Sequence, residues 1–468
     1  MMTKICFLGA GHIGGLTSSV IALKCPHVEV TVCDVVAETI SKWNSDKLPF
    51  YEPGLYDIVK ACRGRNLFFT NDYATAIEKA DVIFITANVP TKTSGIGKGK
   101  AVDLQHVENA ARMIAWYSKS NKVVVEKSTV PVRAAESIMH MLNANKSANV
   151  TFQVLSNPAF LAQGCAIEDL LRPQRILIGS EDSSDGTDAF NKLCSIYEHW
   201  VPKEKIISSN TWSSELSALA TNAMLAQRIS SINSLSAVCE SVGADVSDVS
   251  HAIGCDSRIG SRYLHSSIGF GGSRFQRDIL NLIYICEYLN LPEVATYWQH
   301  VIDMNEYQKT RFSSNIVDVL HNTVKGKRIA LLGFSIKKNT VDTQQSPAIH
   351  IAKTLLDEGA TLHIYDPKVE ESQIFEDLGH SPVCEIPECL PKFLKIYADA
   401  YSALNGTHAI VLCTAWDEFM SLDYKQIYSK MMKPAYIFDG CKSLDHPNLM
   451  KIGFHVHTIG KKIWVTVP

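Results

Sequence analysis

Apolar runs near the start of the chain predict a unit of strand, helix and strand. Residues 5–8 form a short apolar run, and residues 28–33 form a second one after an apolar stretch with helical spacing. This order is typical of a βαβ unit with parallel strands. A third apolar run, residues 81–85, adds another predicted strand to the same sheet.

The same order returns near the other end of the chain. Residues 328–332 and 362–365 are apolar runs on either side of a helix predicted over residues 348–358. Residues 408–413 correspond to the third strand of the first half. The repeat therefore predicts two sheets of the nucleotide-binding type.

Between these sheets the apolar spacing becomes that of long helices. Residues 213–243 and 277–322 carry apolar positions every three to four residues, over lengths beyond those of an ordinary surface helix. The predicted fold class is α/β. It has two Rossmann-like doubly wound parallel-sheet domains, residues 1–211 and 323–468, joined by a central helical domain, residues 212–322.

Composition narrows the classes of function. The 468 residues are enough for roughly three domains. The 45 basic and 48 acidic residues are well mixed and leave a formal charge of -3, so nucleic acid is not an expected partner. No apolar run reaches the roughly 18 residues that a membrane span needs. The 13 cysteines lack metal-ligand spacing. Since the first strand begins too early for a signal peptide, we expect a cytoplasmic protein.

The first glycine-rich turn carries the strongest signal for a ligand. It follows a predicted strand, opens a predicted helix, and precedes an acidic residue at a strand end, Asp34, by 20 residues. Backbone amides in such a turn bind a pyrophosphate, and the carboxylate accepts hydrogen bonds from ribose hydroxyls and repels a 2′-phosphate. NAD is therefore the predicted cofactor. The turn consists of Gly9, Ala10, Gly11, His12, Ile13 and Gly14.

The second repeat has only Gly333 at the corresponding turn. Alone, this turn predicts a sheet and leaves open whether the second domain binds a ligand or is purely structural.

Several ordered motifs carry a resemblance that spans nearly the whole chain. Together with the glycine-rich turn, they resemble the UDP-glucose dehydrogenase family in its animal-type form. The motifs are residues 51–55 (YEPGL), 90–93 (PTKT), 126–132 (EKSTVPV), 212–216 (WSSEL), 226–233 (AQRISSIN) and 269–273 (GFGGS).

The resemblance implies an NAD-binding first domain, a last domain that binds UDP-glucose or a related UDP-sugar, and central helices that form a dimer. It also implies a dimer-based hexamer. The implied reaction oxidises UDP-glucose to UDP-glucuronate with two NAD molecules per sugar.

Arg274 stands where this family carries its nucleophilic cysteine. In the family's reaction, the first oxidation gives an aldehyde, to which a thiolate adds. The adduct is oxidised to a thioester, and water hydrolyses it. A guanidinium remains protonated and offers no nucleophilic lone pair, so Arg274 closes the covalent route.

Further departures from the family pattern surround this one. Ala218 replaces a lysine that stabilises oxyanion character, and Ala159 replaces a glutamate implicated in hydrolysis. Gln163 and Gln344 replace a glutamate and an arginine on the cofactor side. The remaining departures are Thr39 for an adenosine-side arginine, and Cys441 and His265 for substrate-contacting residues.

Other positions match the family pattern. Thr129, Asn222 and Asp278 match residues that position a catalytic water and accept a proton. The implied cofactor contacts also include Val89, Pro90, Thr91 and Ser128. The implied substrate contacts also include Phe160, Leu161, Arg258, Gly269, Phe270, Gly271 and Lys337.

Three functions stay open at this point. The first is the full family activity. The second is a non-catalytic paralogue that binds UDP-sugar or NAD, or joins an active relative's oligomer. The third is oxidation of the alcohol to the aldehyde alone, with Asp278 as the base. Arg274 either folds outward as a solvated charge or points inward and binds a phosphate or carboxylate. Cys441 and Cys165 are predicted to be packing residues and not replacement nucleophiles.

Overall fold

A computed structural model of the chain describes residues 3–379 and 390–462. The chain divides into two compact units. Unit 1 comprises Met1–Thr221 and Leu280–Ala295, and unit 2 comprises Asn222–Ile279 and Thr296–Pro468. The helix α9 runs from one unit into the other. The three domain boundaries predicted from the sequence stay a prediction.

Unit 1 is built on an eight-stranded sheet with the order β3-β2-β1-β4-β5-β6-β7-β8. Its first six strands are parallel, as predicted, but β7 pairs with β6 in the antiparallel sense. The strands are β1 (Lys4–Leu8), β2 (Glu29–Cys33), β3 (Leu67–Thr70), β4 (Val82–Ile85), β5 (Lys122–Glu126), β6 (Phe152–Ser156), β7 (Ile176–Ser180) and β8 (Ile206–Asn210).

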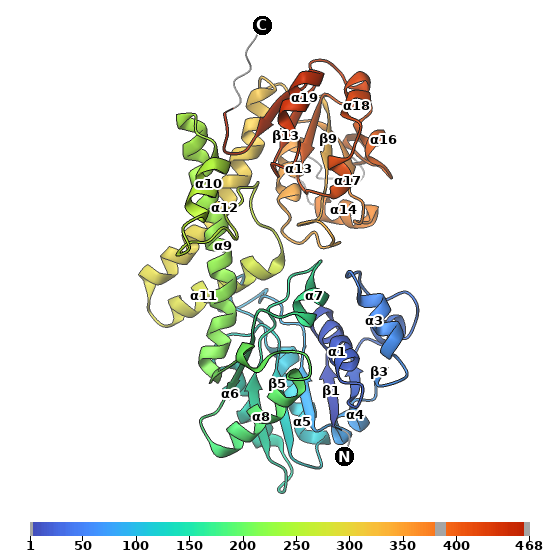
Figure 1. Cartoon of the computed structure of the whole chain (residues 1–468), viewed down its shortest axis with the longest axis vertical. Coiled ribbons are helices and arrows are strands. Elements are labelled where there is room, and N and C mark those ends of the chain that lie inside the picture. The colour runs from blue at the N-terminus through green and yellow to red at the C-terminus, as the bar shows by residue number, and fades with distance from the viewer. Residues whose placement is uncertain (1–2, 380–389, 463–468) are drawn as a thin grey trace. The chain divides into compact units, whose positions relative to one another are not determined.

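Helices cover both faces of this sheet (Figure 1). Because side chains alternate along a strand, Ile5 and Phe7 of β1 join a core with α1, while Cys6 and Leu8 join a second core with α5 and α6. The helices of unit 1 before α9 are α1 (His12–Lys24), α2 (Ala37–Trp43), α3 (Leu55–Cys62), α4 (Tyr73–Lys79), α5 (Gln105–Tyr117), α6 (Ala134–Asn145), α7 (Ala166–Leu171), α8 (Ser184–Tyr197) and the 3-10 turn η1 (Lys203–Lys205).

Unit 2 contains the second sheet, with the order β11-β10-β9-β12-β13-β14 and all pairs parallel. Its strands are β9 (Arg328–Leu332), β10 (Thr361–Tyr365), β11 (Leu394–Ile396), β12 (Ala409–Leu412), β13 (Tyr436–Asp439) and β14 (His455–Thr458). The helices around it are α13 (Pro347–Asp357), α14 (Glu371–Leu378), α15 (Leu390–Phe393), α16 (Ala400–Leu404), α17 (Asp417–Met420), α18 (Tyr424–Lys430) and α19 (His446–Ile452).

The long helices of the middle region are α9 (Thr211–Val242), α10 (Val246–Gly254), α11 (Ser273–Tyr288) and α12 (Pro292–Val319). The helical pattern over residues 277–322 therefore belongs to two helices. The break has a local cause, because Asn290 adopts a left-handed conformation with φ 58° and Pro292 begins α12. Proline fits the first turn of a helix but interrupts its interior.

The predicted α/β class with two Rossmann-like sheets is confirmed. Each predicted βαβ unit is present, and α13 lies within one residue of the helix predicted over residues 348–358. The two halves differ at the first turn. Residues 9–11 connect β1 to α1, whereas residues 333–346 connect β9 to α13. None of the helices in the described part of the chain has the length and apolar character needed to cross a bilayer.

Candidate active site

The glycine-rich turn of unit 1 is held by close backbone packing. Gly9 has a φ of 120°, and a Cβ atom at Gly14 would lie 1.9 Å from the carbonyl oxygen of Gly9. The hydroxyl of Thr86 donates to the same carbonyl at 2.9 Å. In contrast, a Cβ at Gly11 would meet nothing within 4 Å. The turn therefore leaves open space at the position where a pyrophosphate approaches the start of α1.

Asp34 lies half-buried at the carboxyl end of β2, next to this turn. The backbone N–H of Ala10 donates to its Oδ2 at 2.8 Å, and that of Val36 donates to its Oδ1 at 2.9 Å. Each carboxylate oxygen thus has one protein donor and can accept a further hydrogen bond. This geometry suits a ribose with two hydroxyls, and it supports NAD at this site.

Asp366 is the counterpart of Asp34 in the second sheet, but protein donors saturate its carboxylate. It lies directly after β10 and is buried. The donors are the backbone N–H groups of Phe334, Ser335, Lys368 and Val369, the hydroxyl of Ser335 and the indole N–H of Trp416. Asp366 therefore stabilises its own loops and leaves little capacity for a ribose.

Matched alanine variants of these two aspartates are expected to differ in their effects. Asp366→Ala leaves several buried donors without an acceptor and should lower the free energy of unfolding by about 3 kcal/mol. Asp34→Ala should lower it by about 1 kcal/mol. Asp34→Ala should weaken NAD binding about tenfold or more, because a charge-assisted hydrogen bond contributes more than about 1.4 kcal/mol. Urea unfolding and calorimetric NAD titration of both variants measure these effects. Equal losses of NAD affinity would contradict this assignment.

The neighbouring strand ends bring together the other predicted cofactor residues of unit 1. Val89 and Ser128 are buried beyond β4 and β5. The hydroxyl of Ser128 donates to the carbonyl of Ala87 at 3.0 Å, which links the two segments. Thr129 is buried beside Ser128, and Ala159 lies half-buried in the segment after β6. Since β1, β4, β5 and β6 are adjacent, these positions share one edge of the sheet with the glycine-rich turn.

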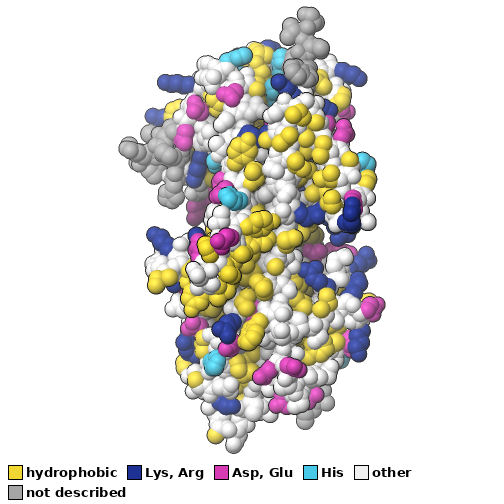
Figure 2. Space-filling model, turned by 90° about the vertical axis from the view of Figure 1, so that its left-hand side faces the viewer, with side chains coloured by type: hydrophobic (Ala, Val, Ile, Leu, Met, Phe, Trp, Pro, Cys, Tyr) yellow, Lys and Arg dark blue, Asp and Glu magenta, His cyan; other side chains and the backbone are white. Residues whose placement is uncertain are grey.

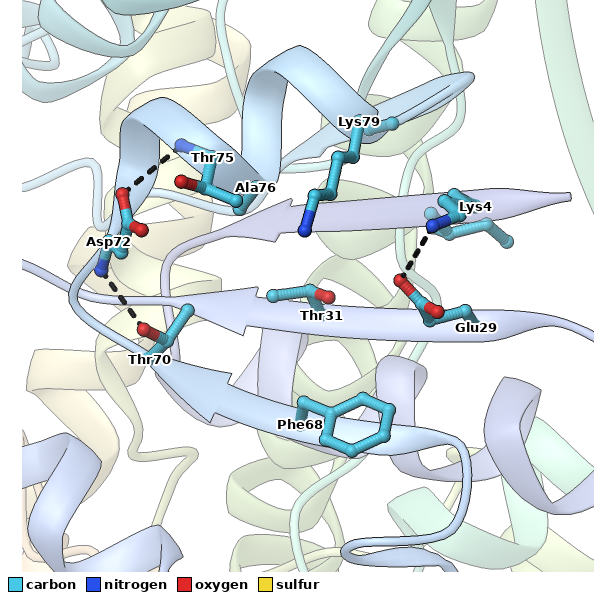
Figure 3. A pocket seen from close by; sticks show the side chains of 11 residues that line it. Lys4, Glu29, Thr31, Phe68, Thr70, Asp72, Thr75, Ala76 and Lys79 are labelled. Atoms are coloured by element: carbon cyan, nitrogen blue, oxygen red, sulfur yellow. Dashed lines mark hydrogen bonds and ion pairs between the residues drawn. The ribbon is translucent and has the colours of Figure 1, made fainter.

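A separate hollow of about 300 Å³ lies on the α4 face of the same sheet. Figure 3 shows Lys79 from α4 above Thr31 of β2, with the ion pair between Lys4 and Glu29 at one end. None of the predicted site residues lines this hollow, so it is distinct from the candidate cofactor site.

Unit 2 holds the retained candidate base, Asp278, in a buried hydrogen-bonded position. The side-chain amide of Asn222 donates to Asp278 Oδ2 at 2.6 Å, and Nε of Arg277 donates to Asp278 Oδ1 at 3.2 Å. Burial raises the pKa of Asp278 above its ordinary value, while Arg277, Asn222 and Arg274 oppose this shift. A buried carboxylate with a raised pKa is suited to accept a proton.

Arg274 lies in the first turn of α11, one helical turn before Asp278. Its side chain is half-buried. Burial lowers the pKa of its guanidinium, while Asp278 and Asp342 act in the opposite direction. The guanidinium therefore lies in the electrostatic surroundings of the candidate base and is not a fully solvated surface charge.

The glycine-rich segment 269–272 precedes α11 and is fixed within unit 2. The backbone N–H of Phe270 donates to Asn305 Oδ1 at 2.8 Å, and Asn305 Nδ2 donates to the carbonyl of Phe270 at 3.0 Å. The N–H of Gly272 donates to the carbonyl of Gln344 at 2.8 Å. Unit 2 thus brings Gln344 together with Gly269, Phe270 and Gly271.

The remaining predicted residues of unit 2 have different surroundings. Cys441 is half-buried, and burial raises the pKa of its thiol, which makes it a poor nucleophile. Lys337 and His265 are exposed. Arg258 is also exposed, and it pairs with Asp256 through contacts of 2.6 to 3.2 Å.

The sequence did not single out two buried charged residues of unit 1. Glu52 accepts the backbone N–H groups of Gly164 and Ala166 and contacts His12 Nε2 at 3.3 Å, so it ties the glycine-rich turn to the segment before α7. Lys127 is buried just beyond β5. Each lies inside a motif that resembles the family, but only the charge of Lys127 next to an apolar strand gave a local signal.

These features define the class of the protein. A Rossmann sheet with an open pyrophosphate turn and a ribose-facing carboxylate fits a bound NAD, and a second unit carries a buried proton acceptor. Together they are typical of a nicotinamide-dependent dehydrogenase.

Comparisons with known proteins define the family. The chain matches the NAD binding domain of the UDP-glucose/GDP-mannose dehydrogenase family over residues 3–201, its central domain over 212–307 and its UDP binding domain over 330–446. The chain belongs to this family, and its cofactor is NAD.

Individual relatives match over almost their whole length. UDP-glucose 6-dehydrogenase of Drosophila melanogaster is 64% identical over 459 residues, which cover 98% of this chain and 96% of the relative. The chicken (Gallus gallus) UDP-glucose 6-dehydrogenase is 58% identical over 462 residues, covering 98% and 93%. A UDP-glucose dehydrogenase structure from Pyrobaculum islandicum is 27% identical, with a TM-score of 0.83, and the match covers 98% of this chain and 97% of that one.

Proposed function

We propose that this chain binds NAD in unit 1 and a UDP-sugar in unit 2, and that it does not complete the oxidation of UDP-glucose to UDP-glucuronate. The observation that carries the proposal is a guanidinium, that of Arg274, in the surroundings of the buried base Asp278. The resemblance implies a thiol at this position. A guanidinium cannot form the covalent adduct from which the second oxidation proceeds.

The retained and lost residues affect different steps of the family's reaction. NAD, when bound, accepts a hydride from the sugar alcohol. Asp278 is the proposed acceptor of the alcohol proton, and Asn222 orients its carboxylate. Ala218 offers no cation to stabilise an oxyanion, and Ala159 offers no carboxylate to activate water. The losses therefore concentrate in the acyl steps.

The UDP-sugar site is proposed from unit 2. Its fixed segment, residues 269–272, and Lys337 are the proposed contacts with the sugar and its phosphates, and Cys441 lacks the charge that the family pattern has there. The proposed domains are residues 1–211 for NAD, 212–322 for dimerisation and 323–468 for the UDP-sugar.

An oligomer and a cytoplasmic location complete the proposal. Figure 2 shows apolar side chains gathered over the central helices. Exposed apolar side chains on the α9 and α12 helices of unit 2 include Leu235, Val238, Val242 and Tyr307, and Ile259 is exposed in the segment after α10. Such a surface supports association with a second copy or with an active relative. No disulfide joins the cysteines in the described part of the chain to one another, which suits a reducing compartment.

The proposal is tested by comparing ligand binding with product release. We expect purified protein to bind NAD and UDP-glucose in calorimetric titrations and to release no UDP-glucuronate at high enzyme concentration. Release of UDP-glucuronate in proportion to the enzyme concentration would show that the chain has the full family activity and would contradict the proposal.

The retained pair of Asp278 and Asn222 favours a second candidate function, oxidation of the alcohol to the aldehyde alone. This function predicts an aldehyde that hydroxylamine traps during incubation with NAD and UDP-glucose. An Asp278→Asn variant is the matched control, because it keeps the shape but removes the proton acceptor. No trapped aldehyde above this control would exclude the second candidate.

A further inference from the structure

Lys127 forms a buried polar cluster with Asn157 and Tyr197 inside unit 1. The lysine is 3% exposed. Its Nζ lies 3.0 Å from Asn157 Oδ1, 3.2 Å from Tyr197 Oη and 3.4 Å from the carbonyl oxygen of Asn157. The hydroxyl of Tyr197 donates to Asn157 Oδ1 at 2.7 Å. Three side chains from the ends of β5, β6 and α8 are thus joined into one network.

The network fixes where the segment after β6 begins. The backbone N–H of Asn157 donates to the carbonyl of Glu126 at 2.8 Å, and its Nδ2 donates to the carbonyl of Leu177 at 2.8 Å. Asn157 opens the segment 157–163, and Lys127 directly precedes Ser128 and Thr129. Both segments contain residues of the candidate cofactor site, so a movement of this network moves them together.

The hydrogen-bond partners of Lys127 carry no negative charge that would offset a positive one. Its three hydrogen-bond acceptors are uncharged groups. The titratable groups that face it are Tyr197 on α8 and Glu126 on β5. Burial raises the pKa of Tyr197, which therefore remains a hydroxyl donor. Burial, together with Glu215, also raises the pKa of Glu126, which weakens it as a counter-ion.

Burial lowers the pKa of Lys127 to about 7, against the opposing effect of Glu126. The uncharged amine has two N–H donors, enough for the two closest acceptors, Asn157 Oδ1 and Tyr197 Oη, but not also for the carbonyl oxygen of Asn157 at 3.4 Å. Protonation places a cation in a buried cluster of neutral groups, where it is costly unless the surrounding segments open towards water.

We propose that Lys127 is a positioning residue whose uncharged form aligns residues 128–129 and 157–163 for the cofactor, so that NAD binds more weakly when Lys127 is protonated. The inference rests on the proposed NAD site of unit 1. It adds a dependence of NAD affinity on the protonation of Lys127, a residue outside the proposed catalytic groups.

The test is the affinity for NAD between about pH 6 and pH 8, measured by calorimetric titration. A ligand that requires the deprotonated form of a group titrating near pH 7 binds about tenfold more tightly at pH 8 than at pH 6. We expect this increase for the natural chain. Lys127→Met keeps the length but removes both the titrating group and its N–H donors, so its affinity should be independent of pH and lower than that of the natural chain at pH 8.

Two further variants distinguish the effect from other causes. Asn157→Asp places a carboxylate beside Nζ, which favours the charged lysine and should move the rise in affinity above pH 8. His12 lies in the glycine-rich turn, where it contacts Glu52 and is not part of the Lys127 cluster. His12→Gln is therefore expected to retain the tenfold dependence. Loss of that dependence in His12→Gln, with its retention in Lys127→Met, would overturn the inference.

Folding and binding failures are separable in this experiment. No NAD binding at any pH by folded natural chain would overturn the proposed function, whereas pH-independent binding would overturn the role of Lys127 alone. The pKa of folded Lys127 is lower than its ordinary value of 10.5, so the unfolded chain binds more protons between about pH 7 and pH 10.5. The free energy of unfolding of the natural chain should therefore rise with pH in this window relative to that of Lys127→Met. If the free energies of unfolding of the two proteins changed in parallel with pH, the pKa of Lys127 would not be lowered in the folded chain.

Discussion

Gly14→Ala is expected to weaken NAD binding strongly and to destabilise unit 1. The added Cβ atom would lie 1.9 Å from the carbonyl oxygen of Gly9 and 2.5 Å from the hydroxyl of Thr86. A contact with backbone at this distance forces the turn and the start of α1 apart. We expect the free energy of unfolding to fall by about 3 kcal/mol and the affinity for NAD to fall more than about a hundredfold, equivalent to about 2.7 kcal/mol.

Gly11→Ala is the matched control for this prediction. Its Cβ atom would meet nothing within 4 Å, so the folded chain should keep its stability. The methyl group would nevertheless occupy the space proposed for the pyrophosphate, and NAD affinity should fall. Urea unfolding and calorimetry on both variants separate the two effects. Undiminished NAD binding by Gly11→Ala would place the cofactor elsewhere.

Arg274→Cys is expected to restore the family's thiol without restoring its activity. A thiol can add to an aldehyde, but Ala218 and Ala159 still leave the oxyanion and the hydrolytic water without assistance. One such donor contributes about 10²- to 10³-fold, and one general base contributes about 10²- to 10⁴-fold. We therefore expect the single variant to release UDP-glucuronate about 10⁴-fold or more slowly than a variant that also carries Ala218→Lys and Ala159→Glu.

The product assay for these variants uses purified protein, NAD and UDP-glucose, with the released sugar acid separated and quantified. Arg274→Ala serves as the control, because it removes the guanidinium without adding a thiol. If Arg274→Cys alone matched the triple variant, the alanines at positions 218 and 159 would be shown not to limit the reaction.

The periodicity of the sequence predicted both βαβ units because each has a short apolar strand, a clear turn and a regular helix. The periodicity did not predict that β7 is antiparallel to β6, since the direction of a strand depends on the path of the segment that precedes it. The single helical pattern over residues 277–322 also concealed a break. Apolar spacing continues across the break, which is marked by the left-handed conformation of Asn290 and by Pro292 at the start of α12.

The position of a site residue could be predicted from the sequence where it depends on residues nearby in the chain. Asp34 follows a strand and a glycine-rich turn at a fixed spacing, so its place beside the turn could be inferred. Asp366 also follows a strand of a predicted βαβ unit, yet its role differs because of donors from distant loops, including Trp416. The contacts of Lys127 and Glu52 could likewise not be inferred from neighbouring residues in the sequence. Their partners are separated from them by 30 residues or more in the chain.

The central claim is that the chain holds its ligands but has lost the thiol-dependent oxidation, and the most direct test is the number of NADH molecules formed per UDP-glucose consumed. The measurement uses saturating NAD and protein at a concentration near that of the sugar, so that even a single turnover is detected. We expect fewer than two NADH per UDP-glucose from folded protein that binds NAD. One NADH per sugar would favour oxidation to the aldehyde, and two per sugar would contradict the proposed loss at Arg274.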